Sequence, residues 1–279
     1  MKELRDRVAV VTGAASGIGR ALCLALAGEG MHVVAADLDG DAAEGVAEEA
    51  RARGRRALAV ATDVSKRDAL DELARRTWDE FGACHLLCNN AGVLVMGPLE
   101  ERSDLDWQWV LGVNLYGVVH GIQAFVPRML RQEGQRHIVN TASISGLVAF
   151  PLVGVYTTTK YAVVGLSESL RADLARHGIG VSVLCPGGVQ TGILQSDRAR
   201  PSELGGEARK PGSVRSVAGS AGAGQDELID PAEVARAVVA GVRENEAFIL
   251  THPRYRGLLE QRHRALLEAC DKAEARGFR

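Results

Sequence analysis

Two ionisable side chains four residues apart carry the clearest chemical signal in this sequence. Tyr156 and Lys160 lie in a segment with helical spacing, and residues four apart share one face of a helix. A phenol has an ordinary pKa of about 10, which is too high for a base at neutral pH. Because a neighbouring ammonium favours the phenolate, the pair predicts a tyrosine that exchanges a proton with a substrate. Ordinary surface helices show the same spacing, so the interpretation needs support from other motifs.

A glycine-rich turn stands near the start of the chain, between an apolar run and a helical pattern. Its glycines are Gly13, Gly17 and Gly19. Glycine permits a tight turn and lets a pyrophosphate approach the backbone, and a helix N-terminus adds N–H groups and a partial positive charge. Ser16 and Ile18 complete this predicted phosphate-binding turn.

Asp37 ends the next apolar run and indicates which dinucleotide the turn would hold. A carboxylate at this point can accept hydrogen bonds from the adenosine ribose hydroxyls, and it repels the 2′-phosphate of NADP. No Arg or Lys directly follows Asp37, and Ser16 rather than a basic residue precedes Gly17. The sequence therefore favours NAD over NADP. The alternative is that Asp37 only caps the following turn.

Short apolar runs alternate with helical patterns along the chain. The expected strands are 8–12, 32–37, 57–62, 86–89, 138–141, 181–185 and 247–250. The expected helices are 18–27, 41–53, 66–81, 104–126, 156–176 and 231–244. This alternation predicts an α/β class, a doubly wound Rossmann fold whose seven-stranded parallel sheet has helices on both faces.

A chain of 279 residues suits one large domain of this kind, and we expect a single domain over residues 1–279. Residues 191–225 are rich in Gly, Ala, Ser, Pro and Arg, and this stretch is too long for an ordinary connection. It is therefore interpreted as a substrate-binding lid or a disordered loop. Residues 253–279 form a charged helical extension in which Leu258, Leu259, Leu266 and Leu267 share one face.

Composition excludes several classes of protein. The chain is 46% hydrophobic and 24% charged, which is ordinary for a globular protein, and its formal net charge is -2. Without a basic excess, nucleic acid is not an expected partner. No segment approaches 18 uninterrupted apolar residues, and the charged stretch 1–7 lacks the features of a signal peptide. No membrane association is therefore expected.

The cysteines give a weak indication of the compartment. Their number is odd and no C-x-x-C pair occurs. We therefore expect buried, reduced thiols rather than disulfides or a metal site. The five are Cys23, Cys84, Cys88, Cys185 and Cys270. Reduced thiols favour a cytoplasmic protein, and no metal is predicted.

The order of the motifs resembles that of the short-chain dehydrogenase/reductase family over about residues 5–250. The matching segments are the cofactor turn Thr12–Gly19, the adenine contact Asp63-Val64, the N-N-A-G segment with Asn90, Ala91 and Gly92, the helix-borne Asn114, Ser143 thirteen residues before Tyr156, and the P-G-x-V-x-T segment with Pro186, Gly187, Val189 and Thr191. Seven ordered motifs together are highly specific. Two departures are mild: His85 stands where the family often has Asp, and Thr159 precedes Lys160 in place of the commoner Ser.

The resemblance implies an NAD-dependent alcohol or hydroxysteroid dehydrogenase, and it assigns roles. Tyr156 would exchange the hydroxyl proton, and Ser143 would hydrogen-bond the substrate oxygen, with Ser145 as the alternative. Lys160 would hold the nicotinamide ribose and lower the pKa of Tyr156. Asn114 would hold a water that links Lys160 to solvent.

The rest of the implied site concerns the nicotinamide and the substrate. Thr191 and the backbone near Val189 would meet the carboxamide. Specificity should come from residues 94–96 and 147–155, from Gly188 and from the 191–225 loop. Their apolar members are Leu94, Val95, Met96, Leu147, Phe150, Leu152 and Val153. They suggest a lipophilic secondary alcohol or ketone, although several of them could be ordinary core.

The arginines and lysine of the loop leave two interpretations open. They could hold an anionic substrate, or they could belong to a solvated lid. These residues are Arg198, Arg200, Arg209, Lys210 and Arg215.

Rival functions and the assembly also stay open at this level. An NADPH-dependent ketoreductase shares the site, an epimerase or dehydratase has no distinguishing residue, and a non-catalytic NAD-binding regulator conflicts with an intact catalytic set. Similar family members are homodimers or homotetramers joined through the helices that hold Asn114 and Tyr156. Trp107, Trp109 and Tyr116 could serve that surface or the core.

Overall fold

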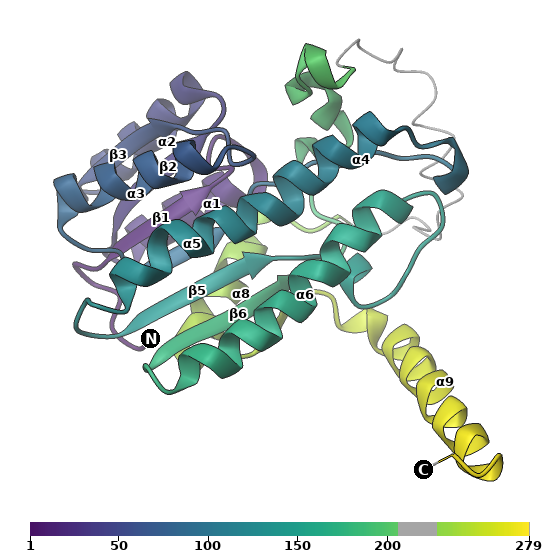
Figure 1. Cartoon of the computed structure of the whole chain (residues 1–279). Helices are drawn as coiled ribbons and strands as arrows, with labels where there is room; N and C mark the ends of the chain where they lie inside the picture. Colours follow the sequence, from purple (N-terminus) through teal and green to yellow (C-terminus); the bar gives the residue numbers. More distant parts are fainter. Residues whose placement is uncertain (206–227, 279) are drawn as a thin grey trace.

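A seven-stranded sheet forms the centre of the protein, and all of its strands run parallel (Figure 1). The computed structural model describes residues 1–205 and 228–278. The strands are β1 Val8–Thr12, β2 His32–Asp37, β3 Ala57–Ala61, β4 Leu86–Asn89, β5 Arg136–Thr141, β6 Ile179–Cys185 and β7 Phe248–Leu250. Their order across the sheet is β3-β2-β1-β4-β5-β6-β7. The predicted fold is confirmed.

Helices cover both faces of this sheet. The α-helices of the described residues are α1 Gly17–Gly28, α2 Gly40–Ala52, α3 Arg67–Phe81, α4 Asp104–Leu111, α5 Gly117–Met129, α6 Gly154–Ala175, α8 Pro231–Glu244 and α9 Arg256–Ala275. Helices α1, α2 and α8 pack over one face, and α3, α5 and α6 pack over the other. The expected boundaries hold to within one or two residues, apart from the 104–126 helix.

The central strand shows why continuous apolar runs become strands here. All five residues of β1 are buried. Ala9 and Val11 join the core under α1 and α8, whereas Val8 and Val10 join the core under α3 and α5. A strand with helices on both faces buries the side chains of both faces, and this accounts for the absence of a polar alternation in the sequence.

The expected helix over 104–126 is divided at its middle. Helix α4 ends at Leu111, a π turn follows over Gly112–Tyr116, and α5 continues to Met129. The site requires this departure, because the π turn contains the buried Asn114. A π turn inside an α-helix adds one residue to the local register, and it is common at functional sites.

Among the described residues, one helical stretch has the length and hydropathy of a membrane span. It runs over Asp104–Met129 for 26 residues with a mean hydropathy of 1.3, and 50% of its apolar window is buried in the protein. Packed core helices have the same composition, so the criterion does not separate the two cases. That no segment meets a membrane stays a prediction.

Two regions predicted outside the Rossmann core have local structure of their own. Two short 3₁₀ turns, Gly192–Ala199 and Ser202–Leu204, follow β6, while residues 206–225 of the predicted loop lie outside the described residues. After β7, a 3₁₀ turn over Pro253–Tyr255 leads into α9, which projects from the body in Figure 1 and has no buried residue.

The positions of the cysteines and large aromatic residues differ partly from expectation. Four cysteines are buried, but Cys270 is exposed on α9, so the expectation of buried thiols is wrong for that residue. Trp109 is buried at 2% exposure, and Trp107 packs beside it. Tyr116 is 53% exposed, so it alone of the three aromatic residues is placed to serve a surface.

Candidate active site

The carboxyl ends of the strands meet at one edge of the sheet, and the predicted site residues gather there. The glycine turn follows β1, Asp37 ends β2, Asn89–Gly92 ends and follows β4, Ser143 follows β5, and Pro186–Thr191 follows β6. The strand order reverses between β1 and β4. In open α/β sheets, ligands bind outside the carboxyl ends of the strands at such a point.

A pair of hydroxyl groups lies at the centre of this edge. The Ser143 hydroxyl lies beside the phenol of Tyr156, which stands in the first turn of α6. Its Oγ also lies 3.4 Å from the carbonyl oxygen of Pro186 and accepts a hydrogen bond from the Ser145 N–H at 3.1 Å. The Ser143 hydroxyl has one proton, which can rotate from the Pro186 carbonyl toward another acceptor. A substrate oxygen bound beside the phenol could be that acceptor. Ser143, which has the expected spacing, is the serine that contacts Tyr156.

Lys160 lies one turn further along α6 and is 2% exposed. Its Nζ donates to the carbonyl oxygen of Thr141 at 2.8 Å and lies 5.4 Å from the ring centroid of Tyr156. Burial lowers the pKa of Lys160 to about 8, and the nearby Cys185 opposes that shift. The Lys160 ammonium and the Tyr156 ring are neighbours, as expected, but the ammonium donates its hydrogen bond to the Thr141 carbonyl.

The pKa of Tyr156 departs from the expectation. Burial raises it to about 12, the hydrogen bond from Ser143 opposes the rise, and Cys185 adds to it. Desolvation of the phenolate is the largest cause of this shift. The phenol is thus protonated at neutral pH. That Lys160 favours the phenolate stays a prediction.

Asn114 joins the catalytic helix to the segment after β4. Its Oδ1 accepts from the Val93 N–H at 2.8 Å, and its Nδ2 donates to the Val93 carbonyl at 2.9 Å and to Thr159 Oγ1 at 3.2 Å. A Cβ built on Gly92 would lie 3.5 Å from Asn114 Oδ1 and 3.6 Å from Lys160 Nζ. Asn114 and Lys160 therefore face the same small space beside Gly92, and the water that would link them stays a prediction.

The glycine turn has the features of a phosphate cradle. Gly13 and Gly17 have positive φ angles of 66° and 51°, which side-chain-bearing residues rarely adopt. Gly19 must lack a side chain, because a Cβ would stand 1.9 Å from the carbonyl oxygen of Gly13. At the start of α1, Ser16 makes no side-chain capping bond and no acidic residue occupies the first turn. The N–H groups of that turn are therefore available to an anion.

The acidic residues of the predicted cofactor site are both hydrogen-bonded. Asp37 accepts from the Ala15 N–H of the glycine turn at 2.9 Å and from the Asp39 N–H at 3.1 Å. Asp37 therefore supports the turn and caps the residues that follow it. Asp63 accepts from Ser65 N and Oγ at 2.9 and 2.7 Å, and Val64 beside it is buried. Their contacts with a nucleotide stay predictions.

Two segments close the cradle around the glycine turn. Asn90 donates from Nδ2 to the Thr12 carbonyl at 3.0 Å, and a Cβ on Gly13 would meet Ala91 Cα at 2.8 Å. On the other side, a Cβ on Gly17 would meet Thr191 Cγ2 at 2.9 Å. The Pro186–Thr191 segment thus spans the distance between Ser143 and the glycine turn.

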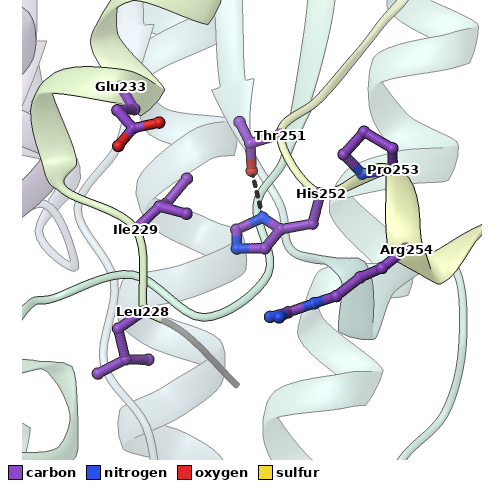
Figure 2. A pocket seen from close by; sticks show the side chains of 7 residues that line it. All are labelled: Leu228, Ile229, Glu233, Thr251, His252, Pro253 and Arg254. Atoms are coloured by element: carbon purple, nitrogen blue, oxygen red, sulfur yellow. Dashed lines mark hydrogen bonds between the residues drawn. The ribbon is translucent and has the colours of Figure 1, made fainter.

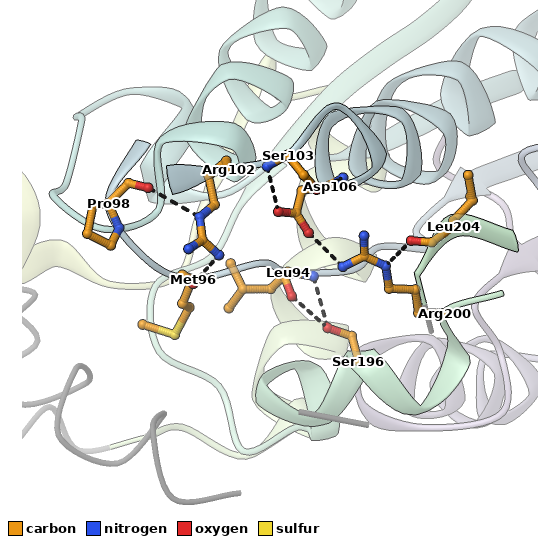
Figure 3. Close-up of polar contacts among 9 residues, drawn as sticks. All are labelled: Leu94, Met96, Pro98, Arg102, Ser103, Asp106, Ser196, Arg200 and Leu204. Carbon is orange, nitrogen blue, oxygen red and sulfur yellow. Dashed lines mark hydrogen bonds and ion pairs between the residues drawn. The ribbon is translucent and has the colours of Figure 1, made fainter. Parts of the chain in front are cut away.

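Two sets of polar contacts hold the described part of the 191–225 loop against α4 and the segment after β4 (Figure 3). Arg200 forms an ion pair with Asp106 at 2.6 Å, and the two side chains are only 11% and 9% exposed. Burial alone would raise the pKa of Asp106, but hydrogen bonds from Arg200 and Ser103 outweigh it and lower that pKa. Ser196 Oγ accepts from the Leu94 N–H at 2.9 Å and contacts the Leu94 carbonyl oxygen at 3.1 Å.

The contacts of Arg200 agree with neither of the two interpretations given for it. The guanidinium also donates to the Leu204 carbonyl and lies 5.2 Å from the Trp109 ring. Arg200 is therefore a structural contact of the loop and is not available to an anionic substrate, nor is it solvated. Arg209, Lys210 and Arg215 lie outside the described residues.

We expect Arg200→Met to release this loop. Removing one partner of a buried ion pair costs about 3 kcal/mol, because the other charge stays desolvated. Chymotryptic cleavage within Gly192–Gly205, read by mass spectrometry, should accelerate at least about tenfold. The double variant Asp106→Asn/Arg200→Met removes the stranded charge and should recover part of the protection. Equal cleavage of the wild type and Arg200→Met would contradict a fastening role for the pair.

The predicted specificity residues separate into two groups. Val95 is 5% exposed and packs with Trp109 and Val155, so it is a core residue. The other six are partly exposed: Leu94, Met96, Leu147, Phe150, Leu152 and Val153. Of these, Leu147 also packs against a core cluster, and that the six contact a substrate stays a prediction.

Comparison with known proteins agrees with this geometry. A family model described as short chain dehydrogenase matches residues 7–202. This chain belongs to the short-chain dehydrogenase family. A C alpha-dehydrogenase from a Sphingobium species is 34% identical over 99% of this chain and 90% of its own length. A 1-deoxy-11-beta-hydroxypentalenate dehydrogenase from Streptomyces exfoliatus is 43% identical over 73% of this chain and 74% of its own.

A solved structure gives the same result in three dimensions. A short chain dehydrogenase/reductase from Burkholderia phymatum, crystallised in complex with NAD, is 40% identical and superposes with a TM-score of 0.90. The match covers 96% of this chain and 97% of that one. The predictions of family membership and of an oxidoreductase acting on CH–OH groups are confirmed.

Three residues of this short-chain dehydrogenase lie at the site although the sequence did not indicate them. Cys185 ends β6 beside Ser143, Tyr156 and Lys160, and burial raises the pKa of its thiol to about 12. His252 and Tyr255 come from the segment after β7 and contact Gly187. No local spacing marks them. Only the pairing of β6 with β7 could have placed this segment beside the site.

Proposed function

We propose that the protein is an NAD-dependent dehydrogenase that interconverts a lipophilic secondary alcohol and its ketone through Ser143, Tyr156 and Lys160. The observation that carries the proposal is the pair of neighbouring hydroxyl groups of Ser143 and Tyr156, with Lys160 one helical turn away. Dehydrogenase relatives support the reaction class. One of them is named for a hydroxypentalenate substrate.

The cradle fits a dinucleotide. Three features support this fit. They are the glycines of the turn, the start of α1 without a side-chain cap, and the carboxylate of Asp37 at the end of β2. Gly13, Gly17 and Gly19 would hold the pyrophosphate, and Asp37 would accept from the adenosine ribose. When bound, NAD supplies the acceptor for the hydride that leaves the carbinol carbon.

The chain's own groups manage the proton and the oxygen. Tyr156 Oη takes the hydroxyl proton in oxidation and returns it in reduction. Ser143 Oγ donates to the substrate oxygen and stabilises charge that develops on it. Lys160 adds a positive charge beside the phenol and would bind the nicotinamide ribose, and Asn114 fixes the backbone of Val93 next to it. Because the phenol is protonated at neutral pH, it is prepared to donate in ketone reduction.

We expect Asp37→Asn to narrow the preference for NAD over NADP at least about tenfold in kcat/KM. A carboxylate within a few ångströms of a phosphate is repelled by about 1 to 4 kcal/mol. Asn keeps an acceptor for the Ala15 N–H, so the turn itself should survive. The matched control is Asp39→Asn, which alters the cap of α2 two residues away. An unchanged cofactor ratio in Asp37→Asn would show that this carboxylate does not face the ribose.

The experiment that tests the function is an initial-rate assay at the NADH absorbance. The protein is given a panel of lipophilic secondary alcohols and ketones, with NAD and NADP, or their reduced forms, in parallel. The proposal expects turnover with the NAD couple, strongest for bulky apolar substrates. Turnover with short polar alcohols alone would contradict the substrate class, and turnover with NADP alone would contradict the cofactor.

Domain organisation, assembly and location complete the proposal. We propose one Rossmann-type domain over residues 1–279 with a lid at about 191–225 and a helical extension at about 253–279. A homodimer or homotetramer would form through the helices that hold Asn114 and Tyr156, where the exposed Tyr116 offers apolar surface. The cytoplasm is the proposed compartment, on the strength of the unpaired thiols.

A further inference from the structure

The end of β7 brings a histidine to the segment that follows β6. In the register of these parallel neighbours, Cys185 pairs with Leu250, so His252 stands opposite Gly187. His252 is 8% exposed. Figure 2 shows its imidazole directed into a pocket between Thr251, Ile229 and Arg254.

Both nitrogens of this imidazole contact the same short segment. Nδ1 accepts a hydrogen bond from the Gly187 N–H at 3.1 Å, and Nε2 lies 3.0 Å from the Gly188 carbonyl oxygen. A carbonyl only accepts, so the second contact needs the proton on Nε2, and the first needs a lone pair on Nδ1. The neutral tautomer protonated at Nε2 satisfies both. Thr251 Oγ1, at 2.7 Å, adds a second contact to Nδ1.

The segment leaves little room for any other arrangement. A Cβ on Gly187 would lie 2.6 Å from Tyr255 Cε2 and 2.9 Å from His252 Cγ, so the two rings pack directly on its backbone. The His252 and Tyr255 rings are 5.9 Å apart, and Tyr255 meets Phe150 edge-on at 6.4 Å. The Gly188 carbonyl also accepts from the Ile229 N–H at 3.2 Å. His252 therefore holds one side of a tightly packed segment.

This segment connects the two halves of the site. At one end the Pro186 carbonyl accepts from the Ile144 N–H at 2.8 Å and contacts Ser143 Oγ at 3.4 Å. At the other end Thr191 packs against Gly17 of the phosphate turn. A dinucleotide whose pyrophosphate lies on that turn and whose reacting ring lies beside Ser143 must pass along residues 187–191.

We propose that His252 is a positioning residue for the nicotinamide end of the cofactor, because it fixes the Gly187–Gly188 backbone through one N–H and one carbonyl. The inference rests on the proposed function, since it concerns the same cofactor site. It adds a residue outside the Ser143, Tyr156 and Lys160 set. Because His252 contacts the segment beside the nicotinamide and not the phosphate turn, its loss should affect only that half of the ligand.

The test compares two ligands that differ in the nicotinamide. Binding of NAD and of ADP-ribose, which lacks the nicotinamide, is measured by calorimetry on the full chain. His252→Ala is expected to raise the Kd of NAD about tenfold, which corresponds to the loss of one net hydrogen bond. The Kd of ADP-ribose should stay within about twofold of the wild-type value.

Two partial replacements and one control sharpen the result. Asn places an amide near the position of Nδ1 and can restore the Gly187 contact, and Gln places one near Nε2 and can restore the Gly188 contact. Both variants should bind NAD better than His252→Ala. The control is His85→Ala: His85 is also 8% exposed and accepts a backbone N–H, from Val8 at 3.1 Å, but at the opposite end of the sheet. It should change neither Kd.

Several outcomes would overturn the proposal. They are equal losses of NAD and ADP-ribose affinity in His252→Ala, an unchanged NAD affinity, or the same selective loss in His85→Ala. If His252→Ala does not fold, the Asn and Gln variants replace it in the test. An equal change in the Kd values of NAD and ADP-ribose in these variants, or no change in that of NAD, would contradict the proposal. Wild-type protein that binds NAD but turns over no alcohol or ketone would contradict the proposed substrate class and leave this inference standing.

Discussion

Tyr156→Phe is expected to lose at least about a thousandfold in kcat, within the range that a positioned proton donor or acceptor contributes. The variant lacks the one phenolic oxygen placed beside Ser143. It keeps the ring that lies 5.4 Å from Lys160 Nζ. Ser143 retains its contacts with Pro186 and Ser145, so no buried hydroxyl is left without a partner. The fold and NAD binding should therefore survive the change.

The measurements are kcat at saturating substrate and the Kd of NADH from its fluorescence. Tyr161→Phe is the matched control, because Tyr161 follows Lys160 on the same helix and contacts Arg262 on α9. It should keep wild-type turnover. Activity of Tyr156→Phe within tenfold of the wild type would remove Tyr156 from its proposed role. Loss of NADH binding together with activity would instead indicate a structural role.

Acidification should destabilise the fold through two buried histidines. Burial lowers the pKa of His137 to about 3 and that of His85 to about 4, with Arg171 and Arg7 among the charges that add to the shifts. Each stays neutral in the folded chain but takes up a proton near pH 6.5 when unfolded. The unfolded state thus binds more protons below pH 6.5, so stability falls as the pH falls from 6.5 toward 4 and 3.

The expected loss is about 2 kcal/mol per histidine between pH 8 and pH 5. Urea unfolding at the two pH values measures it. His137→Gln keeps a polar group for Ser182, which lies 2.8 Å from Nε2, but does not titrate, so it should show a loss smaller by about 2 kcal/mol. The exposed His263→Gln on α9 should behave as the wild type. An equal pH dependence in His137→Gln would refute this assignment.

The sequence predicted the strands well because the central ones, such as β1 and β4, are buried on both faces and therefore form apolar runs with sharp ends. The glycine turn and the Tyr156–Lys160 pair were predictable for a similar reason, since their chemistry depends on short local spacing. The direction of the Tyr156 pKa shift was not, because it depends on how completely the surrounding chain removes water from the phenol.

Contacts between distant parts of the chain account for the remaining differences. Arg200 finds Asp106 at a separation of 94 residues, so its role could not be read from the loop alone. His252 reaches Gly187 across 65 residues, through the register of β6 and β7. A lone histidine after a strand carries no signal until that register is known. The π turn at Asn114 was missed because its flanking residues have ordinary helical spacing.

The π turn sets the angular phase between two halves of one long helix. Each residue of an α-helix advances the direction of its side chain by about 100°, so the extra residue in this turn rotates α4 by that amount relative to α5. Before the turn, Asp106 and Trp109 face the fastened loop, and after it Phe125 faces the sheet. Deleting one residue within Gly112–Tyr116 would restore a regular helix but turn α4 away from Arg200. An insertion or deletion in this turn would therefore break either the contacts of α4 with the loop or those of α5 with the sheet. This constraint does not depend on the amide of Asn114.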